Sequence, residues 1–344
     1  MPKLKAVLTL ALIGGLVAGC SSAAGETGGT RNPVLGASKG SDDGPTAAPS
    51  ALADGMGSDV GKDGVFPRTV KHFKGSTTLK AAPTRIAVLS TGQLDDLLSL
   101  GIVPTATTRA TNAGLVPTYL GTAFPQHKAK LAAMTDAGTR QAPNLETLAA
   151  AKPDLILAND SLGELYPKLA KIAPTVVTAG NGINWKRDLL LVGDAVGKGQ
   201  AAKQLVDSIA ADAVARGKGF SGTSISMVRF TPDRTRMFGV SSFTGSIAVD
   251  MGLGRPESQQ FRAISEDVGA ESIDVADGDW IFYSVQGDAA KTDAASVLAG
   301  PLWQSMKAVK AGHAVNVDDD PWYLNAGPAA ARLVVQQLAE HLGK

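Results

Sequence analysis

Short apolar runs alternate with amphipathic segments along the chain from about residue 66 to residue 342. The runs have the length and aliphatic content of buried strands, whereas the segments between them repeat apolar residues every three or four positions, as helices do. The predicted strands are 85–89, 102–107, 154–158, 175–178, 224–230, 236–240, 279–285 and 314–317. Strands that alternate with helices predict an α/β fold in which helices cover both faces of a parallel sheet.

The predicted helices lie between these strands, and a hairpin precedes the first of them. The hairpin pairs 69–73 with 77–80 across Gly75 and Ser76. The predicted helices are 94–100, 143–151, 163–172, 184–196, 200–216, 246–251, 291–306 and 328–342. The residues between the strand ending at 107 and the helix starting at 143 are expected to form a long loop.

The helix predicted at 200–216 divides this pattern into two halves. Ala201, Leu205 and Ile209 follow one another at four-residue spacing, which makes an apolar stripe along the helix. A helix of about seventeen residues is roughly 25 Å long, enough to pass from one lobe to another. We therefore predict two Rossmann-like lobes with parallel-rich sheets, joined by this single long helix, with a ligand cleft between them. The lobes are 66–182 and 221–344, and helices at 183–220 connect them.

The N-terminal residues have the features of a secretory signal. Residues 1–5 are basic, residues 6–18 form an apolar stretch too short to span a bilayer, and Cys20 is the only cysteine. Small residues directly before this cysteine resemble a bacterial lipoprotein signal, which implies a signal peptide at 1–19 and lipidation of Cys20. A plain secretory signal with an incidental cysteine is the alternative. Lipidation would hold the protein on the extracytoplasmic face of the cell membrane.

Residues 20–65 join this N-terminus to the predicted fold. They are rich in glycine, serine, alanine, proline and aspartate and nearly free of large apolar side chains, so we expect a flexible tether. Forty-odd residues of flexible chain have a mean span of roughly 35 Å. A tether of this length would let the folded part leave a membrane partner and return to it.

Composition and charge argue against several classes of function. A net charge of +1 gives no electrostatic basis for nucleic-acid binding. The four histidines are scattered and the only cysteine is the lipidation candidate, so we expect neither a metal site nor a cofactor. The sequence has no G-x-S-x-G motif, and the glycines at 252–254 lack the lysine of a phosphate-binding loop. These patterns favour a monomeric binding protein over an enzyme.

One stretch, 138–159, combines an arginine, a helix and a buried strand. It reads GTRQAPNLETLAAAKPDLILAN, with Pro143 and Asn144 at the helix start and Pro153 after the helix. In open α/β sheets, ligands bind at the carboxyl ends of the strands, and this strand ends beside Asn159. The stretch resembles a signature of class III substrate-binding proteins of the periplasmic type, which serve iron–siderophore and vitamin B12 importers.

Other stretches resemble the same family over most of the chain from about residue 70. They are 85–89 with 100–102 at the first strand–helix–strand, 228–256 in the second lobe, and 301–328 near the C-terminus. The second-lobe stretch is similar to siderophore-binding members, and the chain as a whole resembles actinobacterial ferric-citrate and siderophore-binding lipoproteins. The resemblance implies capture of a ferric siderophore-type chelate and its delivery to an ABC importer.

A chelate whose iron is fully coordinated needs guanidinium groups and aromatic faces from its protein, and no metal ligands. We therefore expect a cleft for an anionic chelate. Arg140 matches the family's ligand arginine in the first lobe. Arg229 interrupts an apolar strand, where a charge either faces the cleft or is paired. Trp322 and Tyr323 follow a strand end on an expected loop, where ligand contact and ordinary packing both fit.

Weaker ligand candidates lie near other strand ends. Phe238 and Phe243 flank the turn before a predicted helix, and core packing is the alternative for both. Ser90, Gln93 and Ser161 lie just past strand ends, where their side chains can hydrogen-bond ligand oxygens.

The resemblance also implies a contact with the permease of the importer. Family members carry an acidic residue on top of each lobe that engages arginines of the permease. Glu164 matches this position in the first lobe. Asp250 falls at the second-lobe position, where the family usually has glutamate. A solvated helix face is the ordinary alternative for both residues.

Two other functions fit the same pattern. A haem-binding protein of this fold would use a histidine or a tyrosine as axial ligand, the tyrosines being Tyr119, Tyr166, Tyr283 and Tyr323. A lipoprotein that keeps the fold as an interaction module, without transport, is the second alternative. Citrate, hydroxamate, catecholate and mycobactin-like chelates all suit two lobes that carry arginines and aromatic residues.

Overall fold

The protein is described by a computed structural model, which places residues 46–180 and 182–343. The predicted signal peptide at 1–19, the lipidation candidate Cys20 and the first part of the predicted tether lie outside these residues. Within the described ranges, no helix has both the length and the apolar character that a membrane crossing requires.

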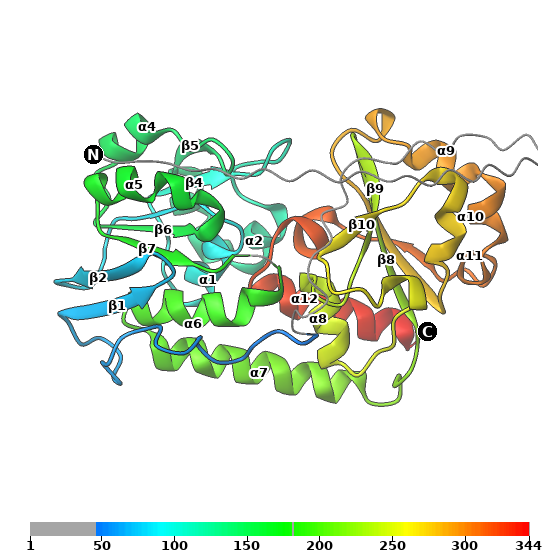
Figure 1. Cartoon of the computed structure of the whole chain (residues 1–344), viewed down its shortest axis with the longest axis horizontal. Coiled ribbons are helices and arrows are strands. Elements are labelled where there is room, and N and C mark those ends of the chain that lie inside the picture. The colour runs from blue at the N-terminus through cyan, green and yellow to red at the C-terminus, as the bar shows by residue number, and fades with distance from the viewer. Residues whose placement is uncertain (1–45, 181, 344) are drawn as a thin grey trace, which may run out of the picture. The chain divides into compact units, whose positions relative to one another are not determined.

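The first lobe is built on a five-stranded parallel sheet with the strand order β5-β4-β3-β6-β7 (Figure 1). Its strands are β3 (Ile86–Val88), β4 (Ala106–Arg109), β5 (Thr135–Thr139), β6 (Leu155–Asn159) and β7 (Thr175–Thr178). The helices that alternate with them are α1 (Gln93–Ser99), α2 (Thr118–Ala123), α3 (Lys128–Ala132), α4 (Leu145–Ala150) and α5 (Tyr166–Ile172). Short helical turns, η1 (Pro125–His127) and η2 (Asp160–Leu165), complete the lobe.

The predicted hairpin covers one edge of this sheet. Its strands are β1 (Arg68–His72) and β2 (Gly75–Leu79), which pair antiparallel. The Phe73 N–H donates to the Val177 carbonyl at 3.1 Å, and the Thr77 hydroxyl donates to the Thr175 carbonyl at 2.7 Å. These bonds tie the hairpin to β7, so the last strand of the sheet does not present a free edge.

The second lobe has a five-stranded mixed sheet with the order β10-β9-β8-β11-β12. Its strands are β8 (Ile225–Thr231), β9 (Arg234–Phe238), β10 (Ser265–Asp267), β11 (Trp280–Val285) and β12 (Ala314–Asn316). β8, β11 and β12 run parallel, whereas β9 is antiparallel to both of its neighbours. The helices are α8 (Phe243–Asp250), α9 (Ala294–Ala299), α10 (Pro301–Ser305) and α11 (Lys307–Lys310). The predicted class of two α/β lobes with parallel-rich sheets is confirmed.

Three helices connect the lobes: α6 (Trp185–Ala195), α7 (Gly199–Gly217) and α12 (Pro328–Leu342). α7 packs against α6, α8 and α12, and α12 also packs against α1 of the first lobe and α8 of the second (Figure 1). The buried residues of α7 include Ala202, Val206, Ile209 and Ala213, which form one stripe. One hydrophobic cluster contains side chains of α1, α6, α7, α8 and α12, so the lobes share a continuous core.

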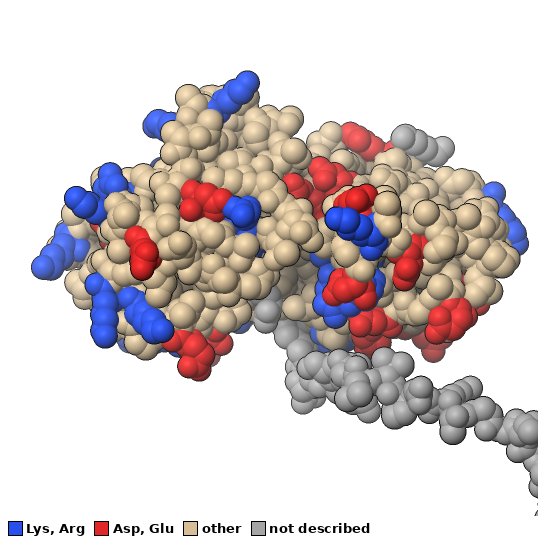
Figure 2. All heavy atoms as spheres, turned by 90° about the horizontal axis from the view of Figure 1, so that it is seen from above, with Lys and Arg blue, Asp and Glu red and all other residues tan. Residues whose placement is uncertain are grey.

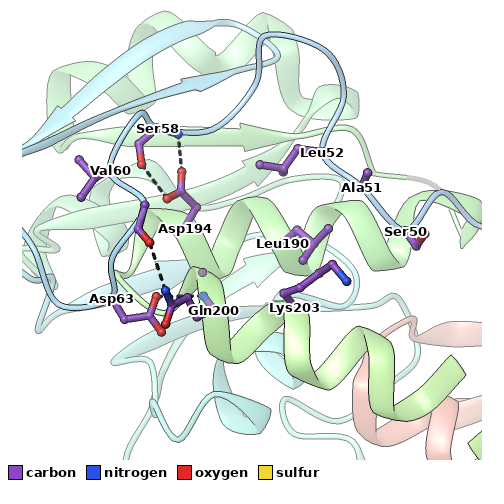
Figure 3. A pocket seen from close by; sticks show the side chains of 12 residues that line it. Ser50, Ala51, Leu52, Ser58, Val60, Asp63, Leu190, Asp194, Gln200 and Lys203 are labelled. Carbon is purple, nitrogen blue, oxygen red and sulfur yellow. Dashed lines mark hydrogen bonds between the residues drawn. The ribbon is translucent and has the colours of Figure 1, made fainter. Parts of the chain in front are cut away.

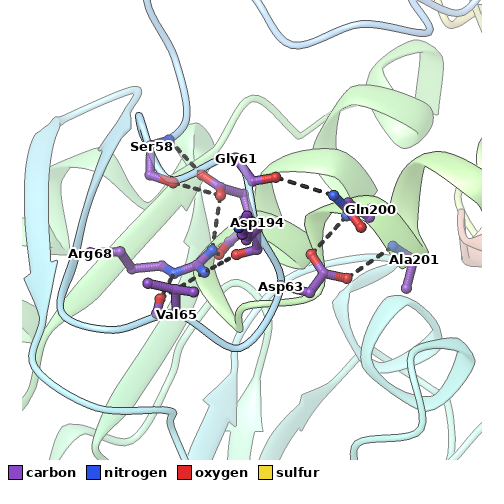
Figure 4. A network of polar contacts seen from close by, with 9 residues as sticks. Ser58, Gly61, Asp63, Val65, Arg68, Asp194, Gln200 and Ala201 are labelled. Atoms are coloured by element: carbon purple, nitrogen blue, oxygen red, sulfur yellow. Dashed lines mark hydrogen bonds and ion pairs between the residues drawn. The ribbon is translucent and has the colours of Figure 1, made fainter.

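Residues 46–65 pack across α6 and α7, and we call them the N-terminal strap (Figure 3). The Ser58 N–H and hydroxyl donate to the Asp194 carboxylate of α6 at 2.5 and 2.7 Å. Arg68, 2% exposed, donates from Nη1 to the carbonyl and carboxylate of Asp194 at 2.5 and 3.1 Å (Figure 4). Asp63 accepts from the N–H groups of Gln200 and Ala201 at 2.9 and 3.3 Å and so caps α7.

The strap corrects the expected tether at its C-terminal end. The sequence predicts a flexible segment as far as residue 65, whereas 46–65 are held by side-chain hydrogen bonds to α6 and α7. A hollow of about 380 Å³ lies between the strap and these helices, with Leu52, Leu190 and Lys203 among its lining residues (Figure 3). It is not at the carboxyl end of either sheet.

Candidate functional site

A cavity of about 420 Å³ opens at the carboxyl ends of the first-lobe strands, and we call it the first-lobe cavity. Loops that follow parallel strands meet at one edge of the sheet, which brings side chains from four strand ends together here. The lining residues are Leu89, Ser90, Thr91, Ala110, Arg140, Gln141, Asn159, Ser161, Leu162 and Leu324.

Arg140 lies directly after β5 and reaches the C-terminal part of the chain. Its Nη1 donates to the Leu324 carbonyl at 3.1 Å and to Thr91 Oγ1 at 3.2 Å, and its Nη2 donates to Asn325 Oδ1 at 2.7 Å. Its Nε is buried and has no hydrogen-bond partner among the described residues. Burial lowers the pKa of this guanidinium, which nevertheless stays cationic at neutral pH. Arg140 Nε–H is therefore a donor that the described residues leave unsatisfied.

The three polar candidates around Arg140 have different roles. The Ser90 hydroxyl is buried without a partner in the wall of the first-lobe cavity. Gln93 does not line that cavity: its Oε1 accepts from the Ser90 N–H at 3.1 Å and its Nε2 donates to the Ala158 carbonyl at 2.9 Å. Gln93 therefore positions Ser90. Ser161 is exposed, lines the cavity and donates to Asn159 Oδ1 at 2.6 Å.

A second cavity, of about 410 Å³, opens at the carboxyl ends of β11 and β12, and we call it the second-lobe cavity. Leu324 lines both cavities, and Gln286 Nε2 of the second lobe lies 3.5 Å from the Thr111 carbonyl of the first. The two cavities are therefore adjoining parts of one cleft between the lobes. The lining residues of the second are Asn112, Ala113, Gly114, Val285, Gln286, Gly287, Asn316, Val317, Asp318, Asp319, Asp320 and Leu324.

Arg229 is paired rather than free to meet a ligand. It lies on β8, is 5% exposed, and donates from Nε and Nη2 to the two carboxylate oxygens of Asp319 at 2.7 and 2.6 Å. The Ser284 hydroxyl donates to the same carboxylate at 2.7 Å. Of the two interpretations that the sequence left open, the structure supports pairing, because this bidentate contact satisfies the buried charge. Arg229 itself does not line the second-lobe cavity, whereas Asp319 does.

Trp322 and Tyr323 take packing positions on the helical turn η7 (Asp320–Leu324). Trp322 is 0% exposed, stacks on Phe282 with ring centroids 5.0 Å apart, and donates from Nε1 to Gln337 Oε1 at 2.6 Å. The Tyr323 hydroxyl donates to the Phe282 carbonyl at 2.6 Å. Neither lines the cleft, so the expected aromatic loop at its mouth is not found: the rings face the core instead.

Phe238 and Phe243 are also core residues. Phe238 is buried against the ring of Tyr323, with centroids 4.8 Å apart. Phe243 is buried with its edge against Trp185 of α6, at 5.7 Å. Ordinary packing, the alternative named for both phenylalanines, is what the structure shows.

The floor of the cleft is fixed by contacts between α1 and the start of α12. Asp95 accepts hydrogen bonds from the Ala329 and Ala330 N–H groups at 2.9 and 3.0 Å, and from the Tyr119 hydroxyl at 3.0 Å. A carboxylate at a helix N-terminus satisfies donors that the helix leaves unpaired. Gly92 approaches so closely that a Cβ there would lie 2.1 Å from the Ala326 carbonyl oxygen. This contact keeps η7 and Leu324 beside Arg140.

The two residues expected to meet a permease differ in exposure. Glu164 is exposed on η2, just past the end of β6. Asp250, at the end of α8, accepts from Lys186 Nζ at 2.6 Å, and its side chain is only 15% exposed. The Asp250 carboxylate is therefore engaged within the protein, whereas that of Glu164 faces solvent.

Among the described residues there is no cluster of three or more histidine, cysteine, aspartate or glutamate side chains that could hold a metal ion. None of the tyrosines considered as haem ligands lines either cavity. Burial raises the pKa of Tyr119, Tyr283 and Tyr323, which disfavours the phenolate that binds haem iron.

Comparison with known families matches this architecture to one of them. The profile of a family described as periplasmic binding protein covers residues 86–321, which include all strands of both five-stranded sheets and the start of η7. The chain belongs to the periplasmic binding protein family. The similar proteins include the probable siderophore-binding lipoprotein YfiY of Bacillus subtilis (strain 168), 32% identical over 80% of this chain and 88% of that protein. The Fe(3+) dicitrate-binding periplasmic protein FecB of Escherichia coli (strain K12) is 26% identical over 78% of this chain and 88% of its own.

Solved structures of this family have the same fold. Staphylococcus aureus SirA, crystallised in complex with staphyloferrin B, superposes with a TM-score of 0.71 and 27% identity, over 80% of this chain and 98% of that one. The likeness spans both lobes, as the family resemblance in the sequence implied. The family consists of binding proteins rather than enzymes.

Most of the cleft lining was not singled out from the sequence. Gln141, Asn159 and Leu162 line the first-lobe cavity, and Gln286, Asn316 and Asp318 line the second. All six lie at or just past strand ends, so a survey of every strand end would have found them. What the sequence did not show is which strand-end side chains face the cleft and which face the core.

Proposed function

We propose that this protein captures a ferric siderophore-type chelate in the cleft between its lobes and delivers it to an ABC importer. One observation carries the proposal: the cleft lies at the carboxyl ends of both sheets and holds Arg140 with an unpaired N–H in its wall. Chelate oxygens are acceptors that suit a guanidinium. Relatives named for siderophore and ferric dicitrate binding support the same ligand class.

The route of delivery is part of the proposal. Lipidation of Cys20 would hold the protein on the extracytoplasmic face of the cell membrane, beside its permease. The exposed Glu164 is the first-lobe residue proposed to meet a permease arginine. For Asp250 to act in the same way, its ion pair with Lys186 would have to open. Capture and release, without catalysis, is the proposed activity.

Haem is not the ligand that the cleft favours. An axial ligand would have to reach the iron from the cleft wall, and no histidine or tyrosine of the described chain lines either cavity. Saturable haemin binding with a Soret shift, in the absence of chelate binding, would contradict the proposal and support a haem carrier.

The proposal is tested by titrating the purified chain with ferric and iron-free siderophores and with haemin, following tryptophan fluorescence. We expect saturable binding of at least one ferric chelate and at least tenfold weaker binding by Arg140→Ala, because the substitution removes a buried cationic donor. Arg216→Ala is the matched control. Arg216 is an exposed arginine on α7, paired with Asp212 at 2.8 Å, and its loss should leave affinity unchanged.

Two results would count against this account. If no ferric chelate binds, the protein is better explained as an interaction module that has kept the fold. If a chelate binds and both arginine variants bind it equally well, the ligand does not sit against Arg140.

A further inference from the structure

The charged side chains that line the cleft are mostly acidic. Among the described residues, Arg140 is the single basic one that lines the first-lobe cavity. The second-lobe cavity is lined by Asp318, Asp319 and Asp320 and, within the described chain, by no lysine or arginine. In Figure 2, acidic side chains lie near the middle of the upper face and over the second lobe, with basic ones among them, and further basic ones gather at the outer end of the first lobe.

Two of the three aspartates keep charge that the protein does not cancel. Asp319 is neutralised by its bidentate pair with Arg229. Asp318 is exposed, forms no ion pair with any described residue, and accepts only the Asp320 N–H at 3.1 Å. Asp320 also forms no ion pair with a described residue; burial and the charge of Asp318 raise the pKa of its carboxyl, whereas Arg140 lowers it. The side chains that line the second-lobe cavity therefore have an excess of negative charge; Arg236, opposite Arg229 in the register of β8 and β9, is outside this lining.

The first-lobe side offers hydrogen-bond donors instead. The Ser90 hydroxyl and Arg140 Nε are both buried, and neither has a partner among the described residues. Ser90 is 7% exposed and lines the first-lobe cavity together with Arg140. Leaving such donors unpaired is costly, so they indicate acceptor oxygens of a ligand at this end. The two ends of the cleft thus differ in what they would bind.

On the basis of the proposed function, we infer that the ligand is a ferric tris-hydroxamate of low net charge that carries an ammonium group. Three hydroxamates, each a monoanion, balance ferric iron, so their chelate core is neutral. Its oxygens would accept from Arg140 and Ser90, and its ammonium group would lie against Asp318 and Asp320. A tris-catecholate keeps several negative charges, which these aspartates repel. The anionic chelate expected from the sequence does not suit this lining.

The test is isothermal titration of the full chain with three ferric chelates at low salt. They are a linear tris-hydroxamate with a free terminal ammonium, the same molecule N-acetylated, and a tris-catecholate. We expect the ammonium form to bind at least tenfold more tightly than its acetylated form and at least a hundredfold more tightly than the catecholate. The comparison needs no substitution, so it does not depend on a variant folding. Raising the salt concentration should reduce the preference.

The aspartates are tested by the double variant Asp318→Asn and Asp320→Asn. We expect the preference for the ammonium form to fall below threefold while the acetylated form binds as before. Asp274→Asn, an exposed second-lobe aspartate outside the cleft, should keep the full preference. Tighter binding of the catecholate, still weakened by Arg140→Ala, would overturn this inference and leave the proposed function standing. Failure of all three chelates to bind would overturn both.

Discussion

Asp194 joins two separate parts of the N-terminal region to α6. Its carboxylate accepts from the Ser58 N–H and hydroxyl and from Arg68, whose other donors bond the Lys62 and Val65 carbonyls at 3.1 and 2.8 Å. The guanidinium of Arg68 is almost fully buried, so the Asp194 carboxylate is the group that neutralises its charge. At such a site, removing one partner costs more than the pair itself contributes.

We therefore predict that Asp194→Ala lowers the free energy of unfolding by roughly 3 kcal/mol, because it leaves Arg68 buried and unpaired. Urea denaturation of the purified chain measures the change. Asp207→Ala on α7 is the control, since Asp207 pairs with Lys203 in an exposed i,i+4 contact whose loss should cost no more than about 0.5 kcal/mol. Equal losses for the two variants would show that the strap is not held in this way.

Single residues also show which parts of the site could be predicted from the sequence. Arg140 was placed at the cleft because it matches the family's ligand arginine, and the structure shows that it directly follows β5 and lines the first-lobe cavity. Trp322 also follows a strand end, yet its ring turns into the core over Phe282. The direction of a side chain on a loop depends on tertiary packing, which a sequence pattern does not encode. For the same reason, Asp318, Asp319 and Asp320 were not predicted to line the cleft.

Elements with strong periodicity were predicted well. The strand at 175–178 and the helix at 328–342 have the bounds of β7 and α12, and Asn144 caps α4 by accepting the Thr147 N–H at 3.0 Å. β5 was taken for loop because TDAGT lacks large apolar residues; it is an edge strand with only Ala137 buried. The single helix expected at 291–306 is interrupted at Gly300, and Pro301 starts a new helix.

The strap shows a different limit of prediction. Its composition is that of a disordered segment, because it has little apolar surface to bury. It is fixed instead by polar contacts with residues more than 120 positions away, such as Ser58 with Asp194 and Asp63 with Gln200. The composition of a segment does not indicate which distant residues will bond to it.

The contact between α1 and the start of α12 yields a prediction for Gly92. A Cβ at this residue would lie 2.1 Å from the Ala326 carbonyl oxygen, and its φ is 86°. We predict that Gly92→Ala destabilises the protein by roughly 2 kcal/mol more than Gly101→Ala. Gly101 lies just beyond the other end of α1 and has a φ of 75°, and a Cβ there would meet no described atom within 4 Å, so it shares the backbone strain without the clash. Thermal and urea unfolding of both variants measure the difference.

At the scale of the whole molecule, several carboxylates are buried in the first lobe and in the connecting helices. Asp188 at α6 accepts from the Ala179 and Gly180 N–H groups at 3.0 and 2.8 Å. Burial raises its pKa from 3.8 to about 7. Burial, together with the charges of Asp95 and Asp188, also raises the pKa of Asp96, one of whose oxygens has no partner among the described residues.

These shifts predict that stability falls as pH rises from about 6.5 to about 7.5, the range in which Asp188 loses its proton in the folded chain. The folded chain keeps protons on these aspartates that the unfolded chain has already lost, so each rise in pH favours unfolding. Burial lowers the pKa of His72 from 6.5 to about 4. This shift makes stability rise with pH, but only below pH 6.5, so it does not oppose the fall above that value. Asp96→Asn should flatten the fall, whereas Asp212→Asn on the exposed face of α7 should not. Urea titrations at several pH values measure the slope, and a stability that rises over this range would refute the assignment.

The continuous core through α1, α6, α7, α8 and α12 also limits how far the two lobes can move apart. Opening the cleft widely would separate side chains that are buried together, so we expect a small movement of the lobes on ligand binding. The strap, which crosses α6 and α7, adds to this stiffness. If the cleft changes little on binding, the residues that line it in this structure determine which ligand binds.

The most direct test of the account is to locate the iron. Crystals of the protein grown with a ferric tris-hydroxamate would be measured at the iron absorption edge, where anomalous scattering marks the metal alone. We predict one peak in the cleft between the lobes, with chelate oxygens toward Arg140 and the second-lobe cavity on the other side. A peak at the hollow beneath the strap, or anywhere outside the cleft, would contradict the proposed site.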